Sequence, residues 1–146
     1  MSVVKALFHI VISTKHREKT IEEANKRELY AYILGIVKNK GCHLIRINGI
    51  ANHIHLLVDL APEIGLSQFI RDLKRSTSFW LKSKPELFPK FEGWGREYYA
   101  FSCSESHRDA VVQYIMNQET HHKVVTFDDE MPTIAGKNGC AYFVLD

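Results

Sequence analysis

Residues 52–60 read NHIHLLVDL, so two histidines lie one residue apart in an otherwise apolar stretch. The aliphatic run carries no helix cap and predicts a strand over residues 53–60. Side chains alternate between the faces of a strand, which puts His53 and His55 on one face. Ile54, Leu56 and Val58 then share the other face. Two imidazoles side by side can hold one metal ion, but histidines in strands also serve as ordinary hydrogen-bonding groups.

The composition indicates one folded domain. The chain has 146 residues, 45% of them hydrophobic and 25% charged, which excludes disordered and collagen-like classes. We expect residues 1–146 to form a single domain, with residues 123–146 as a tail. No apolar run approaches the roughly 20 residues that cross a bilayer, so no membrane partner is predicted. The apolar opening is interrupted by Lys5 and His9 and reads as a strand rather than a secretion signal.

The cysteines bear on the cellular location, and the charge bears on the kind of partner. Cys42, Cys103 and Cys140 show no paired spacing, so neither a disulfide framework nor a four-cysteine zinc site is predicted. With no export signal, this predicts a cytoplasmic protein. The net charge of +2 does not itself indicate nucleic-acid binding. Basic residues cluster in 71–96 and in 15–19. A solvated charged surface is the commoner explanation of such clusters, and contact with a phosphate backbone is the alternative.

The order of predicted elements defines the fold class. Strands are expected at 3–13, 43–48, 53–60 and 98–103, the middle two joined by a turn at Asn48-Gly49. Helices are expected from Thr20 to just before Gly41, from Ser67 to Lys82, and from Ser106 to about His121. Residues 83–95 read as a loop. The result is an α+β, ferredoxin-like β-α-β-β-α-β antiparallel sheet with its third strand in the interior and an additional C-terminal helix.

That C-terminal helix carries a second candidate group. Tyr114 and Gln118 are four residues apart and share a helix face. Gln118 offers a neutral oxygen that suits Mg²⁺ or Mn²⁺ as a third ligand. Tyr114 offers a phenol that could attack a phosphate polarised by such a cation. Without other information, a packed tyrosine beside an exposed glutamine is the commoner explanation of this spacing.

Five segments together carry a family resemblance. They are HIVISTK (9–15), NHIHLLV (52–58), LKRSTS (73–78), YAFS (99–102) and YIMNQETHH (114–122). In this order and spacing, from residue 7 to about residue 130, the sequence resembles the single-tyrosine transposases of single-strand insertion sequences. These belong to the HUH endonuclease superfamily, named for the pattern His-hydrophobic-His.

The resemblance implies a specific chemistry. His53, His55 and Gln118 would hold a divalent cation, Mg²⁺ or Mn²⁺, and Tyr114 would attack the phosphate as nucleophile. Cleavage would leave a 5′-phosphotyrosine and a free 3′-hydroxyl. The family works as a homodimer, often with the tyrosine helix of one subunit completing the site of the other. It recognises single-stranded DNA hairpins at the ends of the element.

The resemblance also implies that the basic clusters contact DNA. Lys15 and Arg17 follow the first strand, and three basic residues lie opposite the apolar stripe of the second helix. We expect DNA contacts from Lys15, Arg17, Lys74, Arg75, Lys82 and Trp94. Trp80 continues the apolar stripe and is expected in the core. The sequence departs from the family pattern at Trp94-Gly95, at Tyr98-Tyr99 and at Pro132, which bears on tail docking and recognition of DNA ends.

Two other functions stay open. A non-catalytic module that binds single-stranded nucleic acid could use the same sheet, although histidines stand on the central strand where such domains carry aromatic residues. A zinc hydrolase could use His53, His55 and a third histidine. His121, two turns beyond Tyr114, is an alternative ligand, and His9 is expected to make a structural hydrogen bond.

Overall fold

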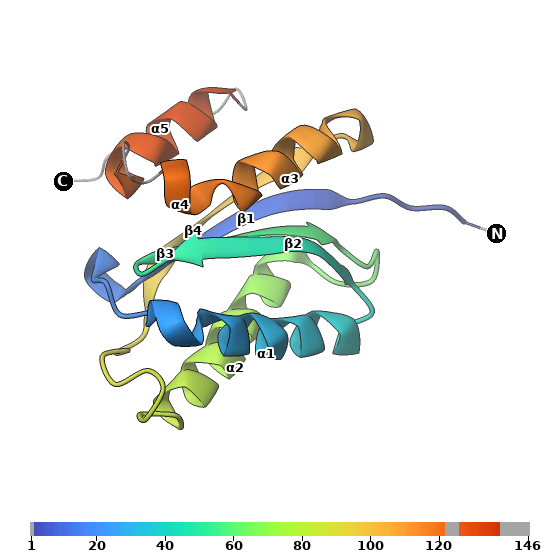
Figure 1. Ribbon diagram of the computed structural model, residues 1–146. Helices are drawn as coiled ribbons and strands as arrows, with labels where there is room; N and C mark the ends of the chain where they lie inside the picture. Colours follow the sequence, from blue (N-terminus) through green and yellow to red (C-terminus); the bar gives the residue numbers. More distant parts are fainter. Residues whose placement is uncertain (1, 122–125, 138–146) are drawn as a thin grey trace.

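A four-stranded sheet with helices on both faces forms the molecule (Figure 1). The computed structural model describes residues 2–121 and 126–137. The strands are β1 (Leu7–Thr14), β2 (His43–Ile50), β3 (His53–Asp59) and β4 (Trp94–Cys103). The helices are α1 (Lys26–Asn39), α2 (Leu66–Lys82), α3 (Arg108–Met116), the short α4 (Gln118–His121) and α5 (Phe127–Lys137), with 3₁₀ turns η1 (Lys15–Arg17), η2 (Glu23–Asn25) and η3 (Glu105–His107). None of these described helices has the length and apolar character needed to cross a membrane.

The strand order confirms the predicted ferredoxin-like sheet. It is β2-β3-β1-β4, all antiparallel, so β3 and β1 are interior. The register pairs His53 with Ser13 and His55 with Val11. Directly paired residues of antiparallel strands lie on the same face. The two histidines therefore share a face with His9 and Val11 of β1.

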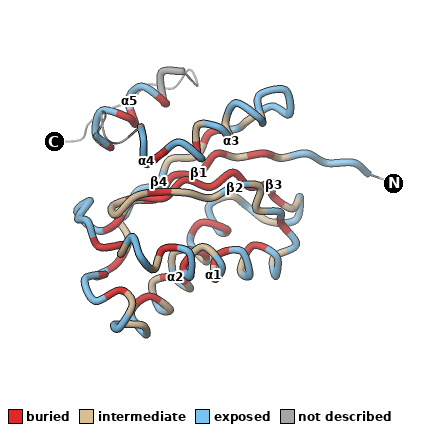
Figure 2. Tube along the Cα trace, viewed as in Figure 1, coloured by how far each residue is buried: buried red, intermediate tan, exposed pale blue. Residues whose placement is uncertain are grey.

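The opposite face holds the main core. Ile54, Leu56 and Val58 point there and pack with α1 and α2, as the alternation of β3 predicts. Figure 2 shows the central strands buried between the two helical layers. Gly41, in the left-handed region at φ 72°, follows the end of α1 as predicted. This layer gives the sheet the rigid backing on which the histidine face depends.

The histidine face is covered by the C-terminal helices (Figure 1). Two small apolar clusters lie there. One joins α5 to the sheet through Val11, Phe101, Phe127, Met131 and Ile134; the other joins α3 to it through Leu7, Leu57 and Ile115. Both α3 and α5 are therefore docked on the sheet of their own chain.

The start of the first helix differs from the prediction. α1 begins at Lys26, after η2, rather than at Thr20. The backbone N–H groups of Thr20 and Ile21 both donate to the carbonyl of Ala51, at 3.0 and 2.9 Å. These hydrogen bonds hold the segment on the turn between β2 and β3, so Thr20 cannot serve as a helix cap. β1 likewise begins at Leu7 rather than at residue 3.

The predicted turn at Asn48-Gly49 is also wrong. Both residues belong to β2, where they pair with His55 and Ile54, and the chain turns at residues 51–52. A Cβ added at Gly49 would lie 2.3 Å from the carbonyl oxygen of His53. The glycine serves close packing of the two strands, and not turn formation.

The third predicted helix is broken. α3 ends at Met116, and α4 starts at Gln118. The side-chain amide of Asn48 donates to the carbonyls of Ile115 and Met116, both at 3.1 Å, which replaces helical hydrogen bonds at that point. The capping role expected of Ser106 is absent, since its hydroxyl bonds within the Ser104–His107 turn. β4 starts at Trp94, inside the predicted loop.

The close approach at Gly49 predicts a stability effect. Gly49→Ala should lower the free energy of unfolding by about 1–3 kcal/mol, because the added methyl overpacks against β3. Urea unfolding followed by circular dichroism measures it. Gly35→Ala in α1 is the matched control, since its Cβ would meet nothing within 4 Å and should raise stability by up to about 1 kcal/mol. Equal stability of the two variants would contradict the packing described here.

Candidate functional site

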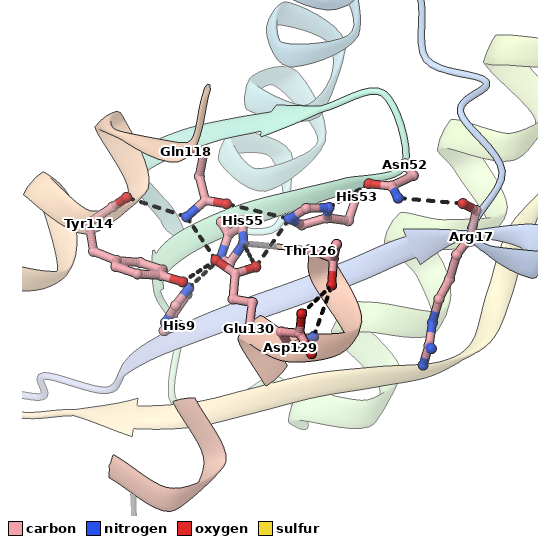
Figure 3. A network of polar contacts seen from close by, with 10 residues as sticks. All are labelled: His9, Arg17, Asn52, His53, His55, Tyr114, Gln118, Thr126, Asp129 and Glu130. Carbon is pink, nitrogen blue, oxygen red and sulfur yellow. Dashed lines mark hydrogen bonds and ion pairs between the residues drawn. The ribbon is translucent and has the colours of Figure 1, made fainter. Parts of the chain in front are cut away.

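The two histidines of β3 form the floor of a buried polar cluster. Both side chains are fully buried. The Nε2 atoms of His53 and His55 lie 3.3 and 3.2 Å from the same oxygen, Oε1 of Glu130 (Figure 3). The ligand atoms of these three residues all lie within 4.8 Å of one another, a spacing that could hold a metal ion.

Glu130 comes from α5 and was not predicted as a site residue. Thr126 starts that helix, since its hydroxyl accepts a hydrogen bond from the backbone N–H of Asp129 at 3.3 Å. The buried residues of α5 then recur at helical spacing, with the carboxylate among apolar neighbours: Phe127, Glu130, Met131 and Ile134. That periodicity, and the Thr126-x-x-Asp129 spacing before it, were the signals in the sequence. Pro132 lies inside the helix and obscured them.

Gln118 joins the cluster from the first position of α4. Its Oε1 is 3.4 Å from Nε2 of His53, and its Nε2 donates to Oε2 of Glu130 at 3.2 Å. The buried ammonium of Lys26 binds both Glu119 and the carbonyl of Gly49, and so holds the start of α4 against the end of β2. Burial disfavours the charge of Lys26, but the carboxylates of Glu119 and Glu23 outweigh it and raise its pKa.

Tyr114 faces the same cluster from α3. Its hydroxyl donates to Oε2 of Glu130, and its ring meets His9 and His55 edge-on at centroid distances of 6.0 and 5.7 Å. Burial, followed by the hydrogen bond and the charge of Glu130, raises the pKa of Tyr114 far above the usual range of a phenol. The phenol is therefore protonated at neutral pH, with its proton directed at a carboxylate.

A second layer of hydrogen bonds orients the two imidazoles. The Nδ1 of His53 lies 2.8 Å from Oδ1 of Asn52, and the Nδ1 of His55 lies 2.8 Å from Nε2 of His9. An amide oxygen only accepts, so Nδ1 of His53 carries the proton. Burial first, and then the neighbouring His55, lower the pKa of His9 to about 3, which keeps that ring neutral and able to accept. The predicted structural hydrogen bond of His9 is thus made to a site residue.

These partners test whether the cluster suits a cation. With its proton on Nδ1, His53 presents a lone pair at Nε2 to a carboxylate oxygen only 3.3 Å away. Such a contact is repulsive unless a positive charge, a proton or a metal ion, lies between the atoms. Two imidazole nitrogens, a carboxylate and an amide oxygen are a donor set that divalent cations accept. The residues present therefore fit a divalent cation.

Near the site, η1 carries two of the residues expected to contact DNA, Lys15 and Arg17. His16 and Arg17 both have left-handed backbones, at φ 57° and 56°. The guanidinium of Arg17 lies over the ring of Phe127 at 5.0 Å and pairs with Asp128. The backbone carbonyl of Arg17 accepts a hydrogen bond from the side-chain amide of Asn52 at 3.4 Å. Asn52 also contacts His53, so η1 is linked to the cluster. The turn therefore borders the cluster and contacts α5.

The other residues expected to contact DNA lie elsewhere. Lys74, Arg75 and Lys82 are on α2, across the sheet from the cluster (Figure 1). The ammonium of Lys74 donates to the carbonyls of Gly95, Arg96 and Glu97, so it organises the start of β4. Arg75 and Lys82 are exposed.

The tryptophans differ from each other. Trp94 is at the start of β4, and its indole N–H donates to Thr77 Oγ1 at 2.8 Å. Trp80 packs against the core, as expected, and stacks on Tyr32. The side chain of His121, the alternative ligand, lies outside the described residues.

The sheet order and the paired histidines define an HUH fold, and the family follows from the sequence comparison. The family model described as "Transposase IS200 like" matches residues 2–118. The chain belongs to this family. It is therefore a transposase of the single-tyrosine type, an enzyme that cleaves DNA.

Known relatives agree with this assignment. The transposase of insertion sequence element IS200 from Salmonella typhimurium is 25% identical over 121 residues, which cover 80% of this chain and 79% of that protein. The ISDra2 transposase TnpA from Deinococcus radiodurans is 24% identical over 76% of this chain and 82% of its own length.

Two solved structures are similar as well. A putative transposase of Deinococcus radiodurans R1 superposes with a TM-score of 0.63 at 26% identity, covering 80% of this chain and 93% of that one. A REP-associated tyrosine transposase, solved bound to a REP hairpin, gives a TM-score of 0.64 over 100% of this chain and 90% of that one. At 12% identity, this second likeness concerns the fold alone.

The second layer predicts an effect on metal affinity. Asn52→Leu should weaken Mn²⁺ binding about 10- to 100-fold, because His53 loses the acceptor that fixes its proton on Nδ1. Isothermal titration calorimetry measures it. Asn52→Asp is the matched control: it retains an acceptor oxygen and should bind at least as tightly as the wild type. Equal weakening in both variants would show that the hydrogen bond to His53 is not the cause.

Proposed function

We propose that this transposase cuts and rejoins single-stranded DNA through a 5′-phosphotyrosine on Tyr114, assisted by a divalent cation, Mg²⁺ or Mn²⁺. One observation carries the proposal. Within a single chain, Glu130 touches the Tyr114 hydroxyl with one oxygen and both β3 histidines with the other. Nucleophile, proton acceptor and candidate cation ligands are thus joined through one carboxylate.

The chain's own residues account for the proton balance. As the phenolic oxygen of Tyr114 bonds to phosphorus, its proton passes to Oε2 of Glu130, which already accepts it in a hydrogen bond. The bond from phosphorus to the 3′ oxygen breaks, and that oxygen takes a proton from solvent. Rejoining reverses the step, since an incoming 3′-hydroxyl attacks the phosphotyrosine and releases Tyr114.

The cation would be held by His53, His55 and Glu130, with Gln118 beside them. It would supply polarisation of the phosphate and offset the negative charge that develops in the transition state. The same residues also keep water away from the cluster, because all four side chains are buried. The proposed ligand set is therefore the predicted one, His53, His55 and Gln118, with the carboxylate of Glu130 added.

The substrate and the assembly are inferred from the family and from surface chemistry. We infer that the enzyme acts as a homodimer in the cytoplasm on single-stranded hairpins at the ends of its element. A polar pocket borders the cluster, lined in part by Thr14, His16, Arg17 and Arg96, and it offers cationic groups to a DNA backbone. A relative of this fold was solved with a hairpin bound.

A second function has one observation in its favour. Two histidines and a glutamate form the ligand set of several zinc hydrolases. In such an enzyme water would be the nucleophile, so Tyr114 would be dispensable. The same variant therefore separates the two functions.

The test is covalent capture of DNA. The purified protein, incubated with Mn²⁺ and hairpin oligonucleotides copied from the sequences that flank its gene, should form an adduct on denaturing gels. Tyr114→Phe should abolish the adduct, because no phenolic oxygen remains to bond phosphorus. Chelation of the metal should also abolish it.

Tyr98→Phe is the matched control. Tyr98 is an exposed tyrosine of β4, so its loss should leave the adduct unchanged. An adduct that persists in Tyr114→Phe would refute the assignment of the nucleophile. Hydrolysis of DNA without any adduct, unchanged in Tyr114→Phe, would favour the zinc hydrolase.

A further inference from the structure

A second pocket, of about 400 Å³, lies beside the cluster on the histidine face of the sheet. It is lined by residues 101–104 at the end of β4, together with His9, His107 and Val111. The volume is within the range of about 300–1,000 Å³ that is usual for small-ligand sites. The metal-binding cluster and the tyrosine step described above make no use of it.

The pocket shares a wall with the candidate active site. His9 lines it, hydrogen-bonds to His55 and meets the ring of Tyr114 edge-on. Val111 lies three residues before Tyr114, so the two side chains share a face of α3. A group in this pocket would therefore lie next to a phosphate under attack by Tyr114.

The lining decides which part of DNA would fit. None of its seven residues is a lysine, arginine, aspartate or glutamate, in contrast to the pocket at Arg17, which is lined by two arginines and a glutamate. A phosphate would find no lysine or arginine there. The lining instead offers aromatic surface, with the rings of His9 and Phe101 inclined at 57° and 6.4 Å apart, and with His107.

Polar groups at the rim suit the edge of a flat heterocycle. The hydroxyl of Ser104 lies 2.7 Å from Nδ1 of His107, which fixes the orientation of that ring. β4 is also an edge strand, so part of its backbone is not paired within the sheet and can bond to a ligand. Aromatic walls with hydrogen-bonding groups at the rim are the usual means of binding an unstacked base.

We propose that this pocket receives the unpaired base of a nucleotide next to the scissile phosphate, and so helps to select the cleavage position. The proposal rests on the function proposed above, because it requires single-stranded DNA at Tyr114. It assigns the base to the pocket at His9 and leaves the charged pocket at Arg17 to the backbone.

The test pairs changes in the DNA with changes in the pocket. Affinities are measured by fluorescence anisotropy in a Tyr114→Phe background, so that DNA is bound but not cut. The ligand is a hairpin that forms the adduct with the wild type, either intact or with one abasic residue at each position flanking the cut. One abasic position should weaken binding about tenfold, the size expected for loss of one stacked base.

Val111→Phe fills the pocket and should bind the intact hairpin about tenfold more weakly, with no further loss from the abasic residue. His107→Ala removes an exposed wall, puts little strain on the fold and should reduce the abasic penalty in the same direction. Gln113→Phe adds the same ring at an exposed position of α3 outside the pocket, and it should behave like the background protein.

The experiment distinguishes failure of the base pocket from failure of the proposed function. If the wild type forms its adduct but the abasic penalty is the same in all variants, or is absent, the base pocket is refuted and the tyrosine chemistry stands. If the wild type forms no adduct with any flanking hairpin, the proposed function fails, and the base pocket fails with it.

Discussion

The site depends on one buried carboxylate. Glu130 is 1% exposed, and a lone carboxylate in such a place would be strongly destabilising. It is tolerated because its oxygens face two imidazoles, an amide N–H and a phenol. The alternation of β3 places the two imidazoles, the start of α4 after the helix break places the amide of Gln118, and the packing of α3 on the sheet places the phenol of Tyr114. The arrangement is complete only when a positive charge lies between Glu130 and the imidazoles.

The same carboxylate holds α5 on the histidine face of the sheet. Phe127 lies against the ring of His53 at 4.6 Å, and Arg17 lies over the Phe127 ring and pairs with Asp128. As a result the candidate ligands are covered within their own chain, and Tyr114 reaches the histidines of the same chain.

Features that depend on residues close together in the chain were predicted correctly. Strand alternation predicted the shared face of His53 and His55. Tyr114 and Gln118 also meet at one cluster, as predicted, although they lie on separate helices, α3 and α4. The errors arose where distant residues intervene. Asn48 bonds to carbonyls 67 and 68 residues away and breaks the predicted helix. Glu130 was missed because one acidic residue in a helix carries no sign of what lies opposite it, and Pro132 argued against the helix itself.

The central claim is that Glu130 is a cation ligand together with the two histidines. The most direct measurement is a Mn²⁺ titration followed by electron paramagnetic resonance, comparing wild type, Glu130→Gln and Asp128→Asn. Asp128 is an exposed carboxylate on the same helix and serves as the matched control. One tightly bound Mn²⁺ is expected in wild type and in Asp128→Asn, and Mn²⁺ affinity should fall at least about tenfold in Glu130→Gln. Equal Mn²⁺ affinity in all three proteins would contradict it.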